Sequence, residues 1–183
     1  MKKITIITNI ALNIVWFRGE IVERLLDNGF NVSIITSYDS TLDTYIKKGC
    51  RIFDVKVDRR GKNIISDLKT LYKYIAILRK ESPVCVLAYT VKANIYAGLA
   101  CSILGIPYIN NITGLGSAFL ANNLLIRIVT LMYKVALKDA KKIFFQNQAN
   151  QDFMLDRKII DKSNSYEIIP GSGVNLQEYQ VKP

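Results

Sequence analysis

Short runs of apolar residues, many of them β-branched, alternate along the chain with longer segments whose apolar residues recur every three or four positions. The short runs fit strands, and the longer segments fit amphipathic helices. Residues 84–88 form an unbroken apolar run, which is typical of a parallel strand buried on both faces. The expected strands are residues 3–8, 32–36, 52–55, 84–88, 108–112, 143–146 and 166–169.

The helical segments carry recognisable start and stop signals. Gly29 follows the segment 17–28 where a helix commonly ends, and Ser66 can cap the start of a helix. The expected helices are residues 17–28, 42–48, 66–80, 94–104, 124–140 and 149–157. Strands and helices that alternate at this spacing imply right-handed βαβ crossovers. The predicted fold is therefore α/β, a doubly wound, mostly parallel Rossmann-like sheet with helices on both faces.

The length of 183 residues, half of them hydrophobic, suits one well-packed domain. We expect this domain to occupy residues 1–169. The Pro and Gly residues of the segment 170–183 are typical of a linker, here one leading toward a missing C-terminal domain. Residues 1–8 begin like a signal peptide, but their apolar run is too short, so a buried first strand is expected.

The amino-acid composition limits the partners and the catalytic groups that this chain can have. Lys and Arg number 25 against 15 Asp and Glu, a formal charge of +10 that favours phosphates, nucleic acid or an acidic membrane as partners. The chain has no His, which removes the commonest general base, the usual Ser triad and most zinc sites, so no metal is expected. Three scattered Cys fit reduced core residues of a cytosolic protein.

Ligands of such sheets bind at the carboxyl ends of the strands, near the switch in strand order. The loop after the first strand lacks the G-x-G-x-x-G fingerprint of dinucleotide sites. Asn9, Asn13 and Arg18 in and after this loop can donate hydrogen bonds to a sugar or a phosphate. An ordinary polar turn with a solvated Arg is the alternative.

The loop after the fourth strand contains Thr90, Lys92 and Asn94. Thr90 and Asn94 can bind a ligand or simply cap the next helix. Lys92 would oppose the helix dipole, and it has no acidic neighbour in sequence. A bound anion such as a diphosphate explains it, although a Lys that extends into water would also fit.

The segment Thr113-Gly114-Leu115-Gly116 follows the fifth strand. Two glycines two residues apart allow backbone N–H groups to converge on an anion, or allow a ligand to approach the backbone closely. A plain turn is the alternative. We predict ligand contacts at Thr113, Gly114 and Gly116.

Two expected helices carry basic stripes. Each could lie at an anionic membrane surface, with the basic side chains facing the lipid, or could be a core helix with a solvated basic edge. Arg127 interrupts the second helix, which argues against a transmembrane span. The predicted membrane-facing residues are Lys69, Lys73 and Lys80 on the first helix and Arg127, Lys134, Lys138 and Lys141 on the second.

Six short motifs in a fixed order carry a family resemblance. They are Asp58-Arg59-Arg60-Gly61-Lys62-Asn63, Thr90-Val91-Lys92-Ala93-Asn94-Ile95-Tyr96, Gly105-Ile106-Pro107, Asn111-Ile112-Thr113-Gly114-Leu115-Gly116, Phe144-Phe145-Gln146-Asn147 and Gly171-Ser172-Gly173-Val174-Asn175. The chain resembles the N-terminal domain of family 4 GT-B glycosyltransferases. The group in question builds capsule, O-antigen and N-linked glycans on undecaprenyl diphosphate.

The resemblance implies two facing Rossmann-like domains. The N-terminal one would bind the lipid-diphosphate-linked acceptor as a peripheral protein on the inner face of the cytoplasmic membrane. The other domain would hold the UDP-sugar donor and the family's acidic pair, so no catalytic residue is assigned here and no cofactor is expected. Many members carry a His in the N-terminal domain, and this chain has none. The motifs add Asn147, Gly171, Ser172 and Gly173 as substrate-binding candidates.

The predicted function is retaining transfer of a hexose or N-acetylhexosamine from a UDP-sugar to a lipid-diphosphate-linked acceptor, with this chain alone inactive. A UDP-sugar 2-epimerase and a non-catalytic basic membrane-surface module are the alternatives. Nucleic-acid binding is poorly supported, because no recognised motif is present and aromatic residues are not interleaved with the basic stripes.

Overall fold

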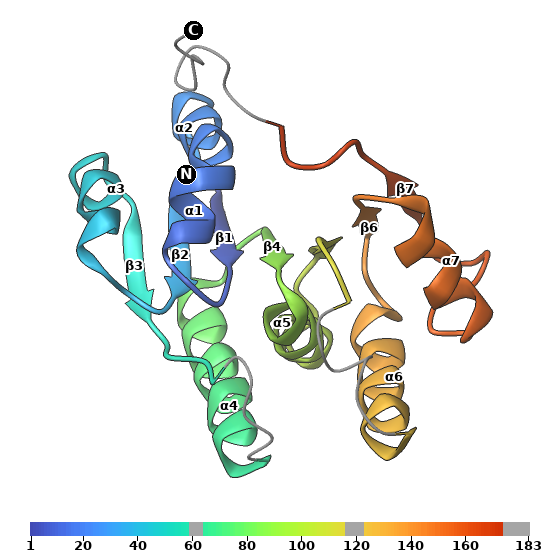
Figure 1. The fold of residues 1–183 in the computed structure, drawn as a ribbon. Coiled ribbons are helices and arrows are strands. Elements are labelled where there is room, and N and C mark those ends of the chain that lie inside the picture. Colours follow the sequence, from blue (N-terminus) through green and yellow to red (C-terminus); the bar gives the residue numbers. More distant parts are fainter. Residues whose placement is uncertain (59–63, 116–122, 174–183) are drawn as a thin grey trace, which may run out of the picture.

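The computed structural model describes residues 1–58, 64–115 and 123–173, and within them a single sheet runs through the molecule (Figure 1). Its seven strands lie in the order β3-β2-β1-β4-β5-β6-β7, and every neighbouring pair is parallel. The strands are β1 (Lys3–Ile7), β2 (Asn31–Thr36), β3 (Arg51–Asp54), β4 (Cys85–Tyr89), β5 (Tyr108–Ile112), β6 (Lys142–Phe145) and β7 (Tyr166–Ile168). The predicted doubly wound α/β fold is confirmed.

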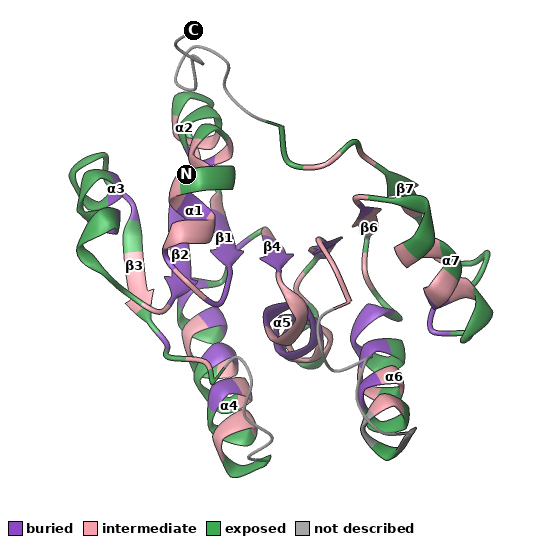
Figure 2. Cartoon of the chain, viewed as in Figure 1, coloured by how far each residue is buried: buried purple, intermediate pink, exposed green. Residues whose placement is uncertain are grey.

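Helices cover both faces of this sheet. They are α1 (Leu12–Phe17), α2 (Gly19–Asp27), α3 (Asp43–Lys47), α4 (Ile64–Glu81), α5 (Val91–Leu104), α6 (Asn123–Leu137) and α7 (Gln148–Asp156), with a 3₁₀ turn at Ser40–Leu42. Alternating strand residues face opposite sides: Ile7 packs with the core of α4, α5 and α6, whereas Ile6 packs with that of α1, α2 and α3. Figure 2 shows the central strands β1, β2 and β4 coloured as buried.

Several helix boundaries differ from the prediction: α5 begins at Val91 and not at residue 94, and α6 ends at Leu137 and not at residue 140. The segment 17–28 is not one helix, because α1 ends at Phe17 and α2 begins at Gly19, with Arg18 at φ −132° and ψ 0° between them. A Cβ at Gly19 would lie 2.6 Å from the hydroxyl oxygen of Tyr45, so glycine permits this close turn. Ser66 does not cap α4, because it lies inside the helix and its carbonyl accepts a hydrogen bond from the Thr70 hydroxyl.

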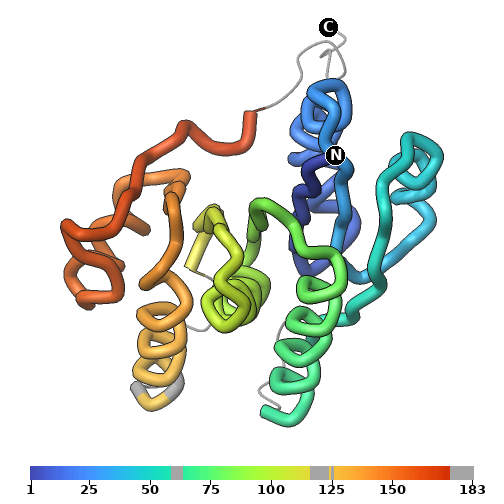
Figure 3. The backbone as a smooth tube through the Cα atoms, turned by 180° about the vertical axis from the view of Figure 1, so that it is seen from behind, coloured from blue at the N-terminus to red at the C-terminus, as the bar shows by residue number. Residues whose placement is uncertain are grey.

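α4, α5 and α6 form a contiguous layer, with α5 between the other two (Figure 3). The contact between α5 and α6 is close at Gly98, where a Cβ would lie 2.3 Å from the carbonyl oxygen of Ala136. The three cysteines are free thiols, as predicted. Burial raises the pKa of the Cys101 thiol to about 12, which leaves it protonated and unreactive at neutral pH. Within the described residues, no helix combines the length and apolar character needed to cross a bilayer.

Candidate functional site

The direction in which successive strands are added reverses between β1 and β4. β2 and β3 lie on one side of β1, whereas β4 to β7 lie on the other. The loops after β1 and β4 therefore diverge and leave a crevice at the carboxyl edge of the sheet. A pocket of about 260 Å³ occupies this position. It is lined by Asn13, Phe17, Arg18, Tyr89, Thr90, Thr113, Gln146 and Ser172.

Arg18 places a buried positive charge in the pocket wall. Its side chain is held by Nη1, which donates to the Phe17 carbonyl at 2.8 Å, and by the ring of Tyr89, 4.2 Å from the guanidinium carbon. Burial lowers the pKa of Arg18, yet a guanidinium stays charged at physiological pH. Only 5% of the residue is exposed, and no carboxylate among the described residues lies within ion-pair distance.

Thr90 lines the same pocket with a strained backbone. Its φ of 74° and ψ of 155° belong to a region that essentially only glycine populates. The residue precedes α5, but its side chain makes no capping hydrogen bond, and its Oγ1 has no hydrogen-bond partner among the described residues. Its hydroxyl is therefore a buried, unpaired polar group in a residue that lines the pocket.

The remaining polar groups of the pocket are neutral. Asn13 Nδ2 donates to the Thr8 hydroxyl at 3.1 Å, which fixes the amide at the end of β1. Gln146 Nε2 donates to the Ser172 hydroxyl at 2.8 Å and so ties the end of β6 to the segment after β7. Of the predicted site residues, the structure brings together Asn13, Arg18, Thr90, Thr113 and Ser172.

Sequence reasoning missed Phe17, Tyr89 and Gln146 as pocket residues. The predicted strand 84–88 stops one residue short of Tyr89, which is the last residue of β4 and supports Arg18. An aromatic at the carboxyl end of a buried strand was the available signal. Gln146 directly precedes a predicted residue, Asn147, whose Oδ1 instead accepts from the Asn150 amide and caps α7.

Asn94 lies outside this pocket. It is 1% exposed, its Nδ2 donates to the Asn111 carbonyl at 2.9 Å, and its Oδ1 accepts from Asn110 at 3.0 Å. Burial of an amide requires such partners. Asn94 therefore fastens α5 to β5, and its side chain is already engaged.

Lys92 also lies outside the pocket, and the argument that it needs an external anion was wrong. Its Nζ lies 2.7 Å from Oδ1 of Asp67 on α4, and both side chains are mostly buried. Burial and the nearby Asp67 carboxylate both raise the pKa of Tyr96. The acidic partner is distant in sequence, and the packing of α4 against α5 brings it close.

The glycine segments behave differently from one another. Gly171 and Gly173 have φ of +70° and +74°, the left-handed region that favours glycine. Gly114 has no positive φ, and a Cβ there would meet nothing within 4 Å. Gly116, Arg59, Arg60 and Lys62 lie outside the described residues.

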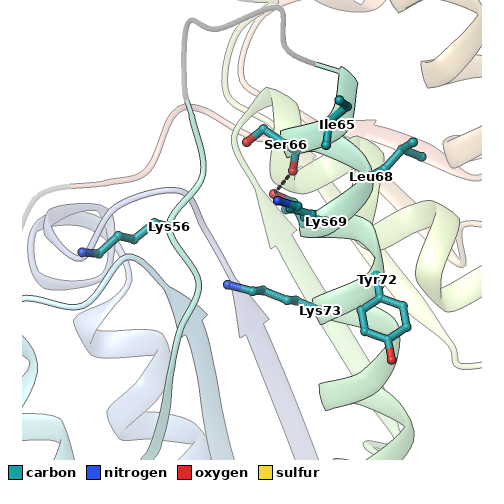
Figure 4. Close-up of a pocket in the computed structure, with 8 residues that line it drawn as sticks. Lys56, Ile65, Ser66, Leu68, Lys69, Tyr72 and Lys73 are labelled. Carbon is teal, nitrogen blue, oxygen red and sulfur yellow. Dashed lines mark hydrogen bonds between the residues drawn. The ribbon is translucent and has the colours of Figure 1, made fainter.

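A second pocket, of about 520 Å³, lies along α4 (Figure 4). Among the described residues that line it are three basic ones, Lys56, Lys69 and Lys73, and no acidic one. Exposed Leu68 and Tyr72 lie on the same helix. The predicted basic stripe of α4 is thus accompanied by an exposed apolar one.

α6 exposes a comparable apolar stripe: Leu124, Ile128, Leu131 and Val135. Arg127 and Lys134 are exposed on the same helix. The predicted four-residue basic stripe was wrong in its extent, because α6 ends at Leu137 and Lys138 and Lys141 follow it. Among the described residues, no group of three or more His, Cys, Asp or Glu is placed to hold a metal ion.

The all-parallel, doubly wound sheet with a polar pocket at its strand-order switch defines a Rossmann-like ligand-binding domain. The family model described as glycosyl transferase 4-like matches residues 6–147. The chain belongs to this family.

A curated relative is the N,N'-diacetylbacillosaminyl-diphospho-undecaprenol alpha-1,3-N-acetylgalactosaminyltransferase of Campylobacter jejuni. It is 25% identical over 182 residues, which cover 97% of this chain and 48% of the relative. The chain thus spans about half the length of this protein.

Two solved structures share the fold. A glycosyltransferase from Rickettsia africae superimposes with a TM-score of 0.69 at 17% identity, over 96% of this chain and 44% of that one. The UDP-GlcNAc 2-epimerase from Methanocaldococcus jannaschii superimposes with a TM-score of 0.60 at 17% identity, over 91% of this chain and 45% of that one. Because transferases and epimerases share it, the fold does not by itself define the reaction.

Proposed function

We propose that this chain is the acceptor-side half of a glycosyltransferase that moves a sugar from a UDP-sugar to a lipid-diphosphate-linked acceptor. Family membership supports sugar transfer. The name of the Campylobacter relative supports an acceptor carried on a polyprenyl diphosphate. The match to about half of that relative supports a second domain for the nucleotide sugar.

The observation that carries the proposal is the pocket at the β1/β4 switch. Amides and hydroxyls of Asn13, Thr90 and Gln146 can pair with sugar hydroxyls, and Arg18 can pair with a phosphate. The family's acidic pair is expected in the other domain. The transfer is proposed to be retaining, because the relative makes an α linkage and common UDP-hexose donors carry an α-linked diphosphate.

The exposed faces of α4 and α6 support peripheral binding to the inner face of the cytoplasmic membrane. Both helices pack against α5 and extend in the same direction (Figures 1 and 3). Each combines exposed apolar side chains with basic ones. An amphipathic surface with this charge binds anionic interfaces and keeps a lipid-linked acceptor near the pocket.

A transfer assay tests the proposal. The complete protein that carries this domain is incubated with labelled UDP-sugars and an isoprenyl-diphosphate-linked sugar, and lipid-linked product is separated and counted. We expect label in the lipid fraction with the complete protein and none with the 183-residue chain. Conversion of a UDP-sugar to its 2-epimer without an acceptor would contradict the proposal, as would turnover by the chain alone.

A further inference from the structure

Arg18 is a buried cation without a compensating carboxylate among the described residues. We infer that Arg18, stacked on Tyr89, is the residue that receives a diphosphate in the switch-point pocket. The choice of diphosphate rests on the proposed function, since donor and acceptor both carry this group. The existence of an anion subsite rests on the geometry alone.

The Arg18 guanidinium is held in one orientation by its neighbours, and two of its nitrogens remain able to bind a ligand. Nη1 donates to the Phe17 carbonyl, and the Tyr89 ring lies against the guanidinium at 4.2 Å. The other two nitrogens have no acceptor among the described residues. A guanidinium fixed in this way presents a planar fork that matches two phosphate oxygens.

The surroundings favour an anion. No Asp or Glu is among the described residues that line the pocket, so none of these residues repels negative charge. Arg18 and Thr90 are also the residues that precede α2 and α5, helices of 9 and 14 residues. The partial positive charge of the first amides of α5 adds to that of Arg18, whereas at Arg18 itself the start of α2 coincides with the end of α1.

Burial without a counter-charge destabilises the ligand-free domain, because the guanidinium has lost part of its hydration. A bound diphosphate compensates for this loss. A purely structural Arg would behave in the opposite way, since its removal would lower stability. Stability and binding are therefore expected to move in opposite directions when Arg18 becomes apolar.

The experiment compares the chain with its Arg18→Met, Arg18→Lys and Arg24→Met variants. Arg24 is an exposed basic residue of α2 and serves as the matched control. Inorganic pyrophosphate, UDP and geranyl diphosphate are titrated by calorimetry at fixed ionic strength, and thermal unfolding is recorded without ligand. We expect Arg18→Met to bind pyrophosphate roughly 10- to 100-fold more weakly, with Arg18→Lys between it and the parent. Arg24→Met should bind like the parent, and ligand-free Arg18→Met should unfold at the parent's temperature or higher.

Tighter binding of UDP than of geranyl diphosphate assigns the subsite to the donor, and the reverse assigns it to the acceptor. The inference is overturned if the parent binds none of the three ligands, or if Arg18→Met binds them equally well. Failure of sugar transfer in the complete protein with Arg18-dependent pyrophosphate binding intact would overturn the proposed function and leave the subsite standing. Wild-type transfer kinetics in the complete protein with Arg18→Met would overturn the subsite and leave the proposed function standing.

Discussion

Lys92 at the start of α5 forms an ion pair with Asp67 at the start of α4, with 2.7 Å between Nζ and Oδ1. The two side chains are only 15% and 19% exposed. Burial and the same carboxylate raise the pKa of Tyr96, which lies one turn after Lys92. The pair therefore joins the N-terminal ends of two neighbouring helices, and its first role is to hold them together.

Lys92→Met is expected to lower the free energy of unfolding by about 1–3 kcal/mol, because it leaves a mostly buried carboxylate without its cation. The double variant Lys92→Met/Asp67→Asn should recover part of this loss. Urea unfolding of both single variants and the double variant gives the coupling energy. Lys69→Met, an exposed position on α4, is the control. Additive effects in the double variant would show that the pair contributes nothing to stability.

Parallel pairing and the place of the pocket follow from features that the sequence displays directly, whereas the strand order β3-β2-β1-β4-β5-β6-β7 was not predicted. β-Branched runs separated by helical segments leave few topologies, and parallel strands bring their carboxyl ends to one edge. Arg18, Thr90 and Thr113 were found in this way. Contacts between distant residues were not, because nothing local to Lys92 indicates Asp67, and nothing local to Arg18 indicates Tyr89.

The predictions of helix boundaries failed where tertiary packing decides where a helix begins or ends. The break at Arg18 lies beside Gly19, where a Cβ would lie 2.6 Å from the hydroxyl oxygen of Tyr45 in α3. A glycine inside a predicted helix was the available signal. Asn94 was a candidate for ligand contact because it follows a strand, yet its amide is engaged with β5. Sequence position alone does not tell which way a polar side chain points.

The chain is expected to bind anionic vesicles more tightly than neutral ones. Lys69→Ala/Lys73→Ala should weaken this binding at low salt by roughly 2 kcal/mol, about 1 kcal/mol for each basic side chain near the surface. Lys2→Ala/Lys47→Ala changes the charge equally at exposed positions away from α4 and should have little effect. Co-sedimentation with phosphatidylserine-containing and neutral vesicles measures both. Equal binding to the two lipids, or insensitivity to salt, would remove the basis for a membrane-facing surface.

Gly98 sets the distance between α5 and α6. In Gly98→Ala the new methyl group would lie 2.3 Å from the Ala136 carbonyl oxygen, so the helices must separate. Overpacking of this kind costs about 1–3 kcal/mol, or more where backbone must move. Gly114→Ala is the control, since a Cβ there meets nothing within 4 Å and no positive φ is lost. Urea denaturation should show a large loss for the first variant and almost none for the second. Similar stabilities of Gly98→Ala and Gly114→Ala would mean that α5 and α6 are further apart at Gly98 than the 2.3 Å distance implies.

Thr90 has a strained backbone and also lines the switch-point pocket. Its φ of 74° and ψ of 155° cost a residue with a Cβ about 1–3 kcal/mol, whereas glycine adopts them without strain. Thr90→Gly should therefore stabilise the ligand-free domain by about 1 kcal/mol, after the greater unfolded-state freedom of glycine is subtracted. Thr90→Ala retains the strain, so Thr90→Gly should be the more stable of the two variants. Both variants remove Oγ1, so both should bind pyrophosphate more weakly than the parent. Urea unfolding should therefore show different stabilities for the two variants, whereas calorimetry should show a similar loss of pyrophosphate affinity in both. If Thr90→Gly is no more stable than Thr90→Ala, the backbone at this position is not strained. If both bind like the parent, the Thr90 hydroxyl makes no contact with the ligand.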